Sequence, residues 1–205
     1  MALALDNTGY DVLNVVALKK MAGPQVIARD AGVEVTTVQA VLAALAEQGL
    51  VALGAGAALP TDDAEPTLRA IADRRYAPVR ADADVERLVE RFESINSQFL
   101  TTMSAWQQVD VGGRKVTNDH TDAEYDGRIV SRLDKLVTRL EPLLDALGGH
   151  DPRFGNYPRR FVAAIDQIDA GRTDFVSSPT LDSIHNIWFE FHEDLLRTMG
   201  RERTE

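Results

Sequence analysis

In the first third of the chain, apolar residues recur every three or four positions, which is the spacing of one face of a helix. Three such runs follow one another. They comprise Val12, Leu13, Val16 and Ala17, then Val26, Ile27 and Ala31, then Val38, Val41, Leu42 and Leu45. Pro24 suits the first turn of the second helix, where its missing N–H costs nothing. Gly32 suits a tight turn before the third. The pattern therefore predicts three helices, the last two joined by a sharp turn.

A short hairpin is expected directly after the third helix. Gly49 ends that helix, and residues 50–53 begin a strand. Residues 54–56 form the tip of the hairpin, and residues 57–59 return as its second strand. The helix expected next is marked by Leu68, Ile71 and Ala72.

This order of elements is that of a winged helix-turn-helix domain. The stretch GPQVIARDAGVEVTTVQAVLAALAEQGLVALGAGA, residues 23–57, carries the pattern. It resembles the MarR-like and related bacterial winged-helix regulators, over residues 10–76. The resemblance implies a winged helix-turn-helix domain over residues 1–78 whose second motif helix enters the major groove of DNA.

The remainder of the chain has the pattern of long helices. Apolar residues keep helical spacing in four runs, which cover residues 85–108, 121–147, 153–170 and 178–200. Residues 109–120 contain Gly112 and Gly113 and have the composition of a loop. Four helices with short connections predict a four-helix bundle-like domain over residues 79–205. The predicted fold class is mostly α, a winged helix-turn-helix head plus a C-terminal helical bundle.

Composition narrows the classes of function. The 205 residues include no cysteine, which excludes disulfides and thiolate metal sites and fits a cytoplasmic protein. No apolar run approaches the roughly 20 residues that span a bilayer, and the N-terminus lacks the features of a signal peptide. No Ser-His-Asp ordering, phosphate loop or dinucleotide fingerprint occurs. We therefore predict a protein that is not an enzyme and binds no cofactor.

Charge complicates the expectation of DNA binding. The net charge is −10, and no Lys or Arg occurs between Asp30 and Leu68, a span that contains the second motif helix and the whole hairpin. Phosphate neutralisation by Lys and Arg supplies most non-specific affinity for DNA. The candidates for DNA contact are Thr36, Thr37 and Gln39 on the second motif helix and Lys19, Lys20 and Arg29 beside it. The alternative is a winged helix kept for packing or for protein contacts, with an alanine-rich face as the docking surface.

The helical half holds candidates for a ligand pocket. Aromatic, amide and imidazole side chains between bundle helices are typical of small-molecule sites. The pocket candidates are Asn96, Trp106, His185, Trp188 and His192. The alternative is a packed core with a few hydrogen-bonded polar groups. His185 and His192 lie seven residues apart, about 10 Å along a helix, so we predict no metal site.

A tight group of arginines stands in DPRFGNYPRRF. Arg153, Arg159 and Arg160 suit an anionic ligand or a carboxylate-rich partner. Because the same half of the chain is rich in acids, internal ion pairing is the alternative explanation.

The C-terminal half also carries a family resemblance. FESINSQFLTTMSAWQ and SIHNIWFEFHEDLLRTMGRER are similar to the helical domain of actinobacterial winged-helix proteins. Some of those proteins are associated with phosphoenolpyruvate-utilising enzymes of the pyruvate phosphate dikinase type. The resemblance implies a regulatory or accessory module.

Two functions follow from these patterns. The first is a transcription-regulator-like protein that binds double-stranded DNA as a homodimer, with a helical domain that dimerises or senses a small-molecule effector. The second is a non-DNA-binding interaction module for a protein partner, such as a phosphoenolpyruvate-utilising enzyme. Neither involves a membrane. The two hypotheses differ in whether the helix-turn-helix surface is positively charged.

Overall fold

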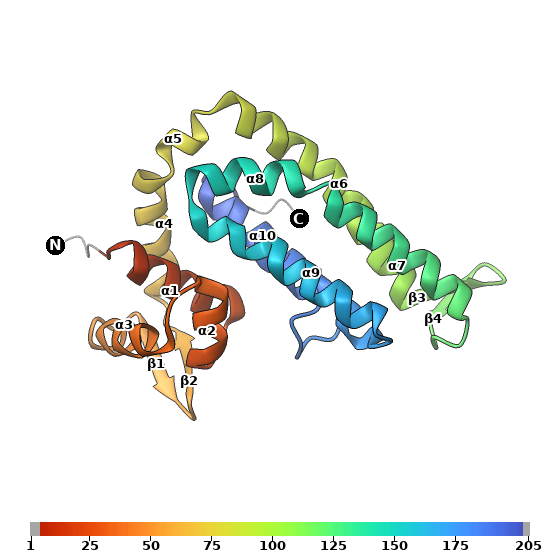
Figure 1. Cartoon of the computed structure of the whole chain (residues 1–205), viewed down its shortest axis with the longest axis horizontal. Coiled ribbons are helices and arrows are strands. Elements are labelled where there is room, and N and C mark those ends of the chain that lie inside the picture. The colour runs from red at the N-terminus through yellow and green to blue at the C-terminus, as the bar shows by residue number, and fades with distance from the viewer. Residues whose placement is uncertain (1–4, 203–205) are drawn as a thin grey trace. The chain divides into compact units, whose positions relative to one another are not determined.

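The computed structural model describes residues 5–202 and is mostly helical, with two small antiparallel hairpins (Figure 1). Its contacts divide the chain into two compact units. Unit 1 comprises the described residues 5–82, 151–156 and 189–202, and unit 2 comprises residues 83–150 and 157–188. The predicted domains, 1–78 and 79–205, stay a prediction, but the last helix contributes residues to both compact units.

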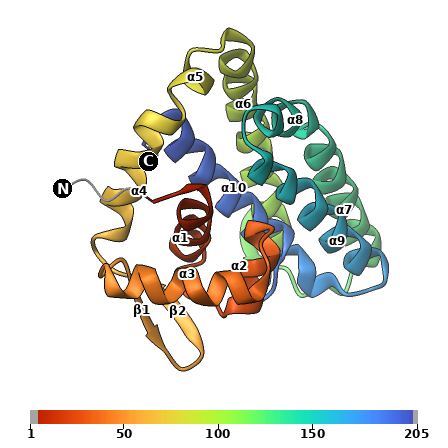
Figure 2. The same ribbon diagram turned by 60° about the vertical axis from the view of Figure 1, so that its left-hand side comes forward.

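Unit 1 contains the helices and the hairpin predicted from the first third of the chain. Its elements are α1 (Asn7–Lys19), α2 (Pro24–Ala31), α3 (Val35–Glu47), β1 (Val51–Gly54), β2 (Ala57–Pro60), α4 (Ala64–Arg75), α5 (Ala77–Arg80), the 3-10 turn η1 (Pro152–Gly155) and the second half of α10 (Ile184–Met199). Helix α1 packs against α2, α3 and α4 (Figure 2). Its residues Tyr10, Val12, Leu13 and Val16 are fully buried.

Local sequence explains where these elements begin and end. The Asp6 carboxylate accepts a 2.7 Å hydrogen bond from the backbone N–H of Gly9 and so caps α1. Pro24 lies in the first turn of α2, and Gly32 ends that helix with φ +67°. Ala55 and Gly56 both have positive φ and form the two-residue turn between β1 and β2. Val41, expected in the core, is only half-buried.

Unit 2 is built mainly from helices. Its elements are α6 (Ala83–Gln107), β3 (Gln108–Val111), β4 (Arg114–Thr117), α7 (Ala123–Thr138), α8 (Glu141–His150), α9 (Asn156–Asp169, of which residues 157–169 belong here), η2 (Thr173–Val176) and the first turn and a half of α10. Figure 1 shows α6 and α7 side by side, with the β3–β4 hairpin joining them at one end.

Three expectations for this half were wrong. Residues 109–120, expected as a loop, include the β3–β4 hairpin, because Gly112 and Gly113 adopt positive φ in a two-residue turn between Val111 and Arg114. The helix expected over 121–147 is two helices, because Pro142 has no N–H to donate to the carbonyl of Thr138. The last helix begins at Ile184 rather than near Ser178, after residues 177–183 in turns.

Among the described residues, no helix is both long enough and apolar enough to cross a membrane.

Gly32 offers a test of the turn between α2 and α3. A Cβ at this position would lie 3.3 Å from the Asn156 side chain, on a backbone with φ +67°. We expect Gly32→Ala to lower the free energy of unfolding by about 1–2 kcal/mol, since the L-residue is strained there. Gly127→Ala is the matched control: it adds a methyl to open space inside α7 and should stabilise by about 0.5–1 kcal/mol. Urea unfolding measures the free energy of unfolding of both variants. A change of the same sign in both would contradict the turn geometry.

Candidate functional site

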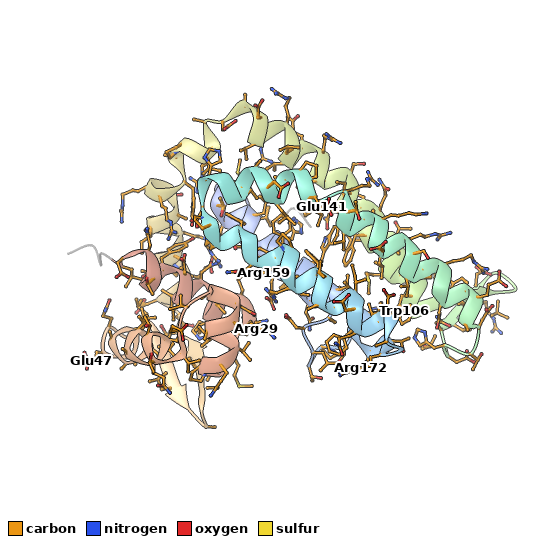
Figure 3. All side chains as sticks on the ribbon, viewed as in Figure 1. Arg29, Glu47, Trp106, Glu141, Arg159 and Arg172 are labelled. Atoms are coloured by element: carbon orange, nitrogen blue, oxygen red, sulfur yellow. The ribbon has the colours of Figure 1, made fainter. Side chains whose placement is uncertain are left out.

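The outer face of α3 carries the predicted contact residues. Val38, Leu42 and Leu45 are buried against the rest of unit 1. The exposed positions are Thr36, Thr37, Gln39, Ala40, Ala43, Ala44 and Glu47. Figure 3 shows Glu47 projecting from the end of the helix. Thr36, Thr37 and Gln39 therefore lie where the sequence predicted, but the centre of the face is alanine.

The cations predicted beside this face differ from one another in their exposure and in their ion pairs. Lys19 Nζ lies 3.0 Å from Asp30 Oδ2 and 2.8 Å from Glu190 Oε1, and its side chain is only 13% exposed. Arg29 Nε donates to the other oxygen of Asp30 at 2.5 Å, with half of the Arg29 side chain exposed. Lys20 is exposed. Asp30 thus serves as the counter-ion for two of the three cations that were expected to reach phosphate.

A buried polar network occupies the interior of unit 1, and Arg153 is at its centre. Arg153 Nε donates to Tyr76 Oη at 2.9 Å, and Nη2 donates to Thr198 Oγ1 at 2.9 Å. Its Nη1 forms an ion pair with Asp194, whose side chain is 1% exposed. Burial alone would lower the pKa of Arg153, but Asp194, Tyr76, Tyr10 and Asp151 together outweigh burial and raise it. Arg153 is therefore charged and fully satisfied.

The network extends from Arg153 to α1, α4 and α10. Asp194 Oδ1 accepts a 3.0 Å hydrogen bond from Asn14 Nδ2 on α1. Asp151 Oδ2 accepts from Tyr76 Oη at 2.8 Å and from Arg75 Nη2 at 2.7 Å. Arg197 bonds Asn14 and also donates to Glu65 Oε2 at 2.6 Å. Although burial would raise the pKa of Asp151, Arg153 and Arg75, together with the hydrogen bonds from Tyr76 and the Arg153 backbone, hold it below its usual range. These charges link segments that are far apart in the sequence.

The arginine group predicted from DPRFGNYPRRF is accordingly divided. Arg160, in unit 2, makes a bidentate pair with Asp182, through Nε–Oδ2 at 3.0 Å and Nη2–Oδ1 at 2.6 Å. Arg159 is exposed. Internal ion pairing, the alternative explanation for this group, is confirmed for Arg153 and Arg160.

The aromatic candidates of unit 2 lie in two separate places. The Trp188 ring stacks on Phe99 with centroids 4.0 Å apart, and Trp188 Nε1 donates to Asn96 Oδ1 at 3.0 Å. The His185 ring lies 6.2 Å from Phe99, and burial lowers the pKa of His185. Asn96, His185 and Trp188 are thus brought together in a packed aromatic cluster in which Trp188 uses the Asn96 acceptor. His192 belongs to unit 1.

Trp106 lies in a second cluster that the sequence did not reveal. Its Nε1 donates to Ser177 Oγ at 3.2 Å, and its ring lies 4.3 Å from the His120 ring. His120 Nδ1 is 2.9 Å from Asp126 Oδ2, and Asn118 Nδ2 donates to Asp126 Oδ1 at 2.9 Å. This cluster fastens the segment after the β3–β4 hairpin to α7. The polar run from Asn118 to Asp126 was the one signal in the sequence that pointed to it.

A cavity in unit 2 is lined by none of the pocket candidates. It has a volume of about 160 Å³ and lies among α7, α9 and α10, with apolar walls and the carboxylates of Asp134 and Asp169. Sites for small-molecule ligands usually have about 300–1,000 Å³. The cavity is therefore too small for a typical organic effector.

Comparisons with known proteins gave no match to a protein-family model, a curated protein or a solved structure.

The Arg153–Asp194 pair provides a test of the network. Arg153→Met would leave the Asp194 carboxylate buried without its counter-ion, and we expect the free energy of unfolding to fall by about 3–5 kcal/mol. Arg74→Met removes an exposed arginine of α4 in the same unit and should change the free energy of unfolding by less than about 0.5 kcal/mol. Equilibrium unfolding in urea measures both. A small effect at Arg153 would show that the network does not stabilise unit 1.

Asp11 makes stability dependent on pH. It lies 3.2 Å from Arg75, but burial raises its pKa from 3.8 to about 6, outweighing the opposite effect of Arg75. Between pH 4 and 6 the folded chain keeps a proton that the unfolded chain has lost, so this group destabilises the fold as the pH rises through that window. We expect Asp11→Asn to gain stability relative to the original chain by on the order of 2 kcal/mol between pH 4 and pH 7. Urea unfolding of both proteins at pH 4 and pH 7 tests this. If the free energy of unfolding changed equally with pH in the variant and in the original chain, the prediction would be contradicted.

Proposed function

We propose that residues 7–75 form a winged helix-turn-helix module that binds another protein, rather than DNA, through the outer face of α3. The proposed fold is supported by the order of elements: α2 and α3 joined at Gly32, followed by the two-residue hairpin β1–β2, with α1 packed against both helices. The helices of unit 2 correspond in this proposal to the C-terminal helical bundle.

The observation that carries the proposal is the lack of positive charge on α3 and the hairpin. Neither element has a Lys or Arg, and Lys19 and Arg29 are held by Asp30. A helix in the major groove is normally accompanied by cations on the flanking phosphates, and each phosphate contact contributes to affinity at physiological salt. Thr36, Thr37 and Gln39 can form hydrogen bonds to DNA, but they carry no positive charge and so make no such electrostatic contribution to affinity.

The same face has the features of a protein-binding surface. Ala40 and Ala43 are exposed and small, so a partner helix or loop can approach the α3 backbone closely. On the hairpin, Leu53 and Leu59 are 52% and 39% exposed. Leu53 pairs with Ala58 and Leu59 with Ala52, so the two leucines lie on opposite faces of the ribbon and one of them provides an apolar anchor. Hydrophobic side chains left in solvent at such a surface favour association.

Charge at the edge of the face defines the chemistry of the partner. The acids there are Glu34, Glu47, Asp62 and Asp63, all of them exposed. A second copy of the chain would bring the same carboxylates against each other in a symmetric contact. The partner is accordingly a different protein, with an apolar centre flanked by Lys or Arg. This agrees with the accessory role that the resemblance of the C-terminal half implies.

Site-specific photocrosslinking in the source cells tests the proposal. A photoreactive residue replaces Ala43 on α3 or, as a control, Ala70, which is exposed on α4. We expect one protein adduct, identified by mass spectrometry, from position 43 and none from position 70. Ala40→Arg should weaken that adduct at least about tenfold, because it places a cation opposite a basic partner. Ala70→Arg makes the same charge change away from the face and should have no effect.

DNA binding by α3 would give the opposite results. Ala40→Arg would strengthen retention of duplex DNA, Thr36→Ala/Gln39→Ala would weaken it, and the position 43 adduct would be sensitive to nuclease. Any of these outcomes, or an adduct unaffected by Ala40→Arg, would overturn the assignment of α3 as a protein-binding face.

A further inference from the structure

Helix α7 in unit 2 carries a row of exposed cations. Arg128, Arg132, Lys135 and Arg139 follow one another at intervals of four, three and four residues, and all four are exposed. On a helix with 3.6 residues per turn this spacing forms one stripe, roughly 16 Å long. We call these four residues the α7 stripe.

The α7 stripe is little neutralised by acids, as are other exposed cations of the described residues such as Lys20 and Arg74, and it differs from these in having four cations in one row. Within residues 5–202, no acid forms an ion pair with Arg132 or Lys135. Arg128 pairs only with the highly exposed Glu124, and Arg139 Nη1 donates to the uncharged Gln98 Oε1 at 2.7 Å. Exposed ion pairs of the Arg128–Glu124 kind contribute little. Four cations therefore face solvent in a chain whose net charge is −10.

The surroundings of the stripe are mostly uncharged polar or basic side chains, with the exposed acids Glu124 and Glu90 at their edges. The Arg139–Gln98 bond places the stripe on the flank of α7 next to α6, and Figure 1 shows these two helices side by side. Exposed residues of α6 within about one turn or two of Gln98 on that flank are Arg91, Ser94 and Thr101. The acid Asp134 lies on the opposite flank of α7, where it lines the cavity with Asp169 of α9.

Of the other exposed side chains of α6, Glu90 lies at the edge of this flank, on the side of Ser94 and Thr101, whereas Glu93 and Leu100 point away from it. Glu90 lies about 80° and Glu93 about 140° around the helix from Gln98, and the exposed Leu100 lies about 160° away. Apart from the Glu90 carboxylate at its edge, the flank that adjoins the stripe thus combines guanidinium and ammonium groups with hydroxyls and amides. These are the groups that contact phosphate oxygens in protein–DNA complexes.

We propose that the α7 stripe binds the phosphate backbone of a double-stranded nucleic acid without reading its bases. Single-stranded nucleic acid is bound by stacking on exposed aromatic rings, membranes by exposed large apolar residues, and proteins by an apolar interface core. The stripe and its α6 flank offer none of these. The inference concerns unit 2 and is independent of the α3 face proposed for protein binding.

Salt-dependent binding of a random-sequence duplex to the full chain tests the inference. Fluorescence anisotropy at several salt concentrations should show affinity that falls steeply with salt, because bound phosphates release counterions. Arg132→Gln/Lys135→Gln should weaken binding about tenfold at about 50 mM salt and reduce the log–log salt slope by about 2, because two phosphates are no longer neutralised. Both residues are exposed, so thermal unfolding should be unchanged.

A matched control removes two exposed cations from unit 1 instead. Lys20→Gln/Arg74→Gln makes the same change in net charge, and we expect it to leave the affinity and the salt slope within twofold of the original chain. Equal weakening in both double variants would indicate only general charge attraction and would overturn the inference. Displacement of the duplex by polyglutamate at equal charge, or by a single strand of the same length, would also overturn it, in favour of an acidic protein or single-stranded nucleic acid.

Discussion

Unit 1 depends on a buried charge pair between two segments far apart in the sequence. Arg153 and Asp194 are both almost inaccessible to water, and each satisfies its remaining hydrogen-bonding groups from other elements. Moving such charges from water into a protein interior is costly unless every partner is present. Asn14 of α1, Tyr76 at the end of α4, and Thr198 of α10 must therefore all be in place together. No partial arrangement of the four segments satisfies the pair, so we expect it to favour this one arrangement over others.

The ion pairs inside unit 1 also determine which charged side chains remain on its surface. Lys19 and Arg29 are drawn to Asp30, while Arg75, Arg153 and Arg197 are drawn into the network. What remains exposed on α3 and the hairpin is alanine, leucine, threonine and acid. In unit 2 the distribution is different, because Arg132 and Lys135 of α7 have no acidic partner among the described residues. In unit 1 the cations expected beside α3 are thus reduced to the exposed Lys20 and the half-exposed Arg29, whereas α7 of unit 2 carries four exposed cations in one row.

Much of unit 1 could be predicted because its helix ends and buried helix faces are determined by residues that are close together in the sequence. Pro24, Gly32 and Gly49 mark helix ends through backbone conformation alone, and the helical spacing of Val38, Leu42 and Leu45 identified the buried face of α3. The exposure of Thr36, Thr37 and Gln39 followed from the same spacing. Unit 2 was less predictable: the effect of Pro142 on the long apolar run and the pairing of two four-residue strands were both missed. Short strands give too few alternating positions to be distinguished from a loop.

By itself, the sequence determined the order of helices in unit 1, the absence of cations from α3 and its hairpin, and the lack of cysteine chemistry, because each is a property of neighbouring residues or of composition. Only the tertiary structure decided which charges are neutralised. Lys19 looked free to bind phosphate until Glu190, 171 residues later in the chain, was found 2.8 Å away. Asn96 and Trp188 looked like pocket residues until they were found bonded to each other across 92 residues. Pairing between distant segments depends on how the chain folds back on itself, so it cannot be inferred from the spacing of neighbouring residues.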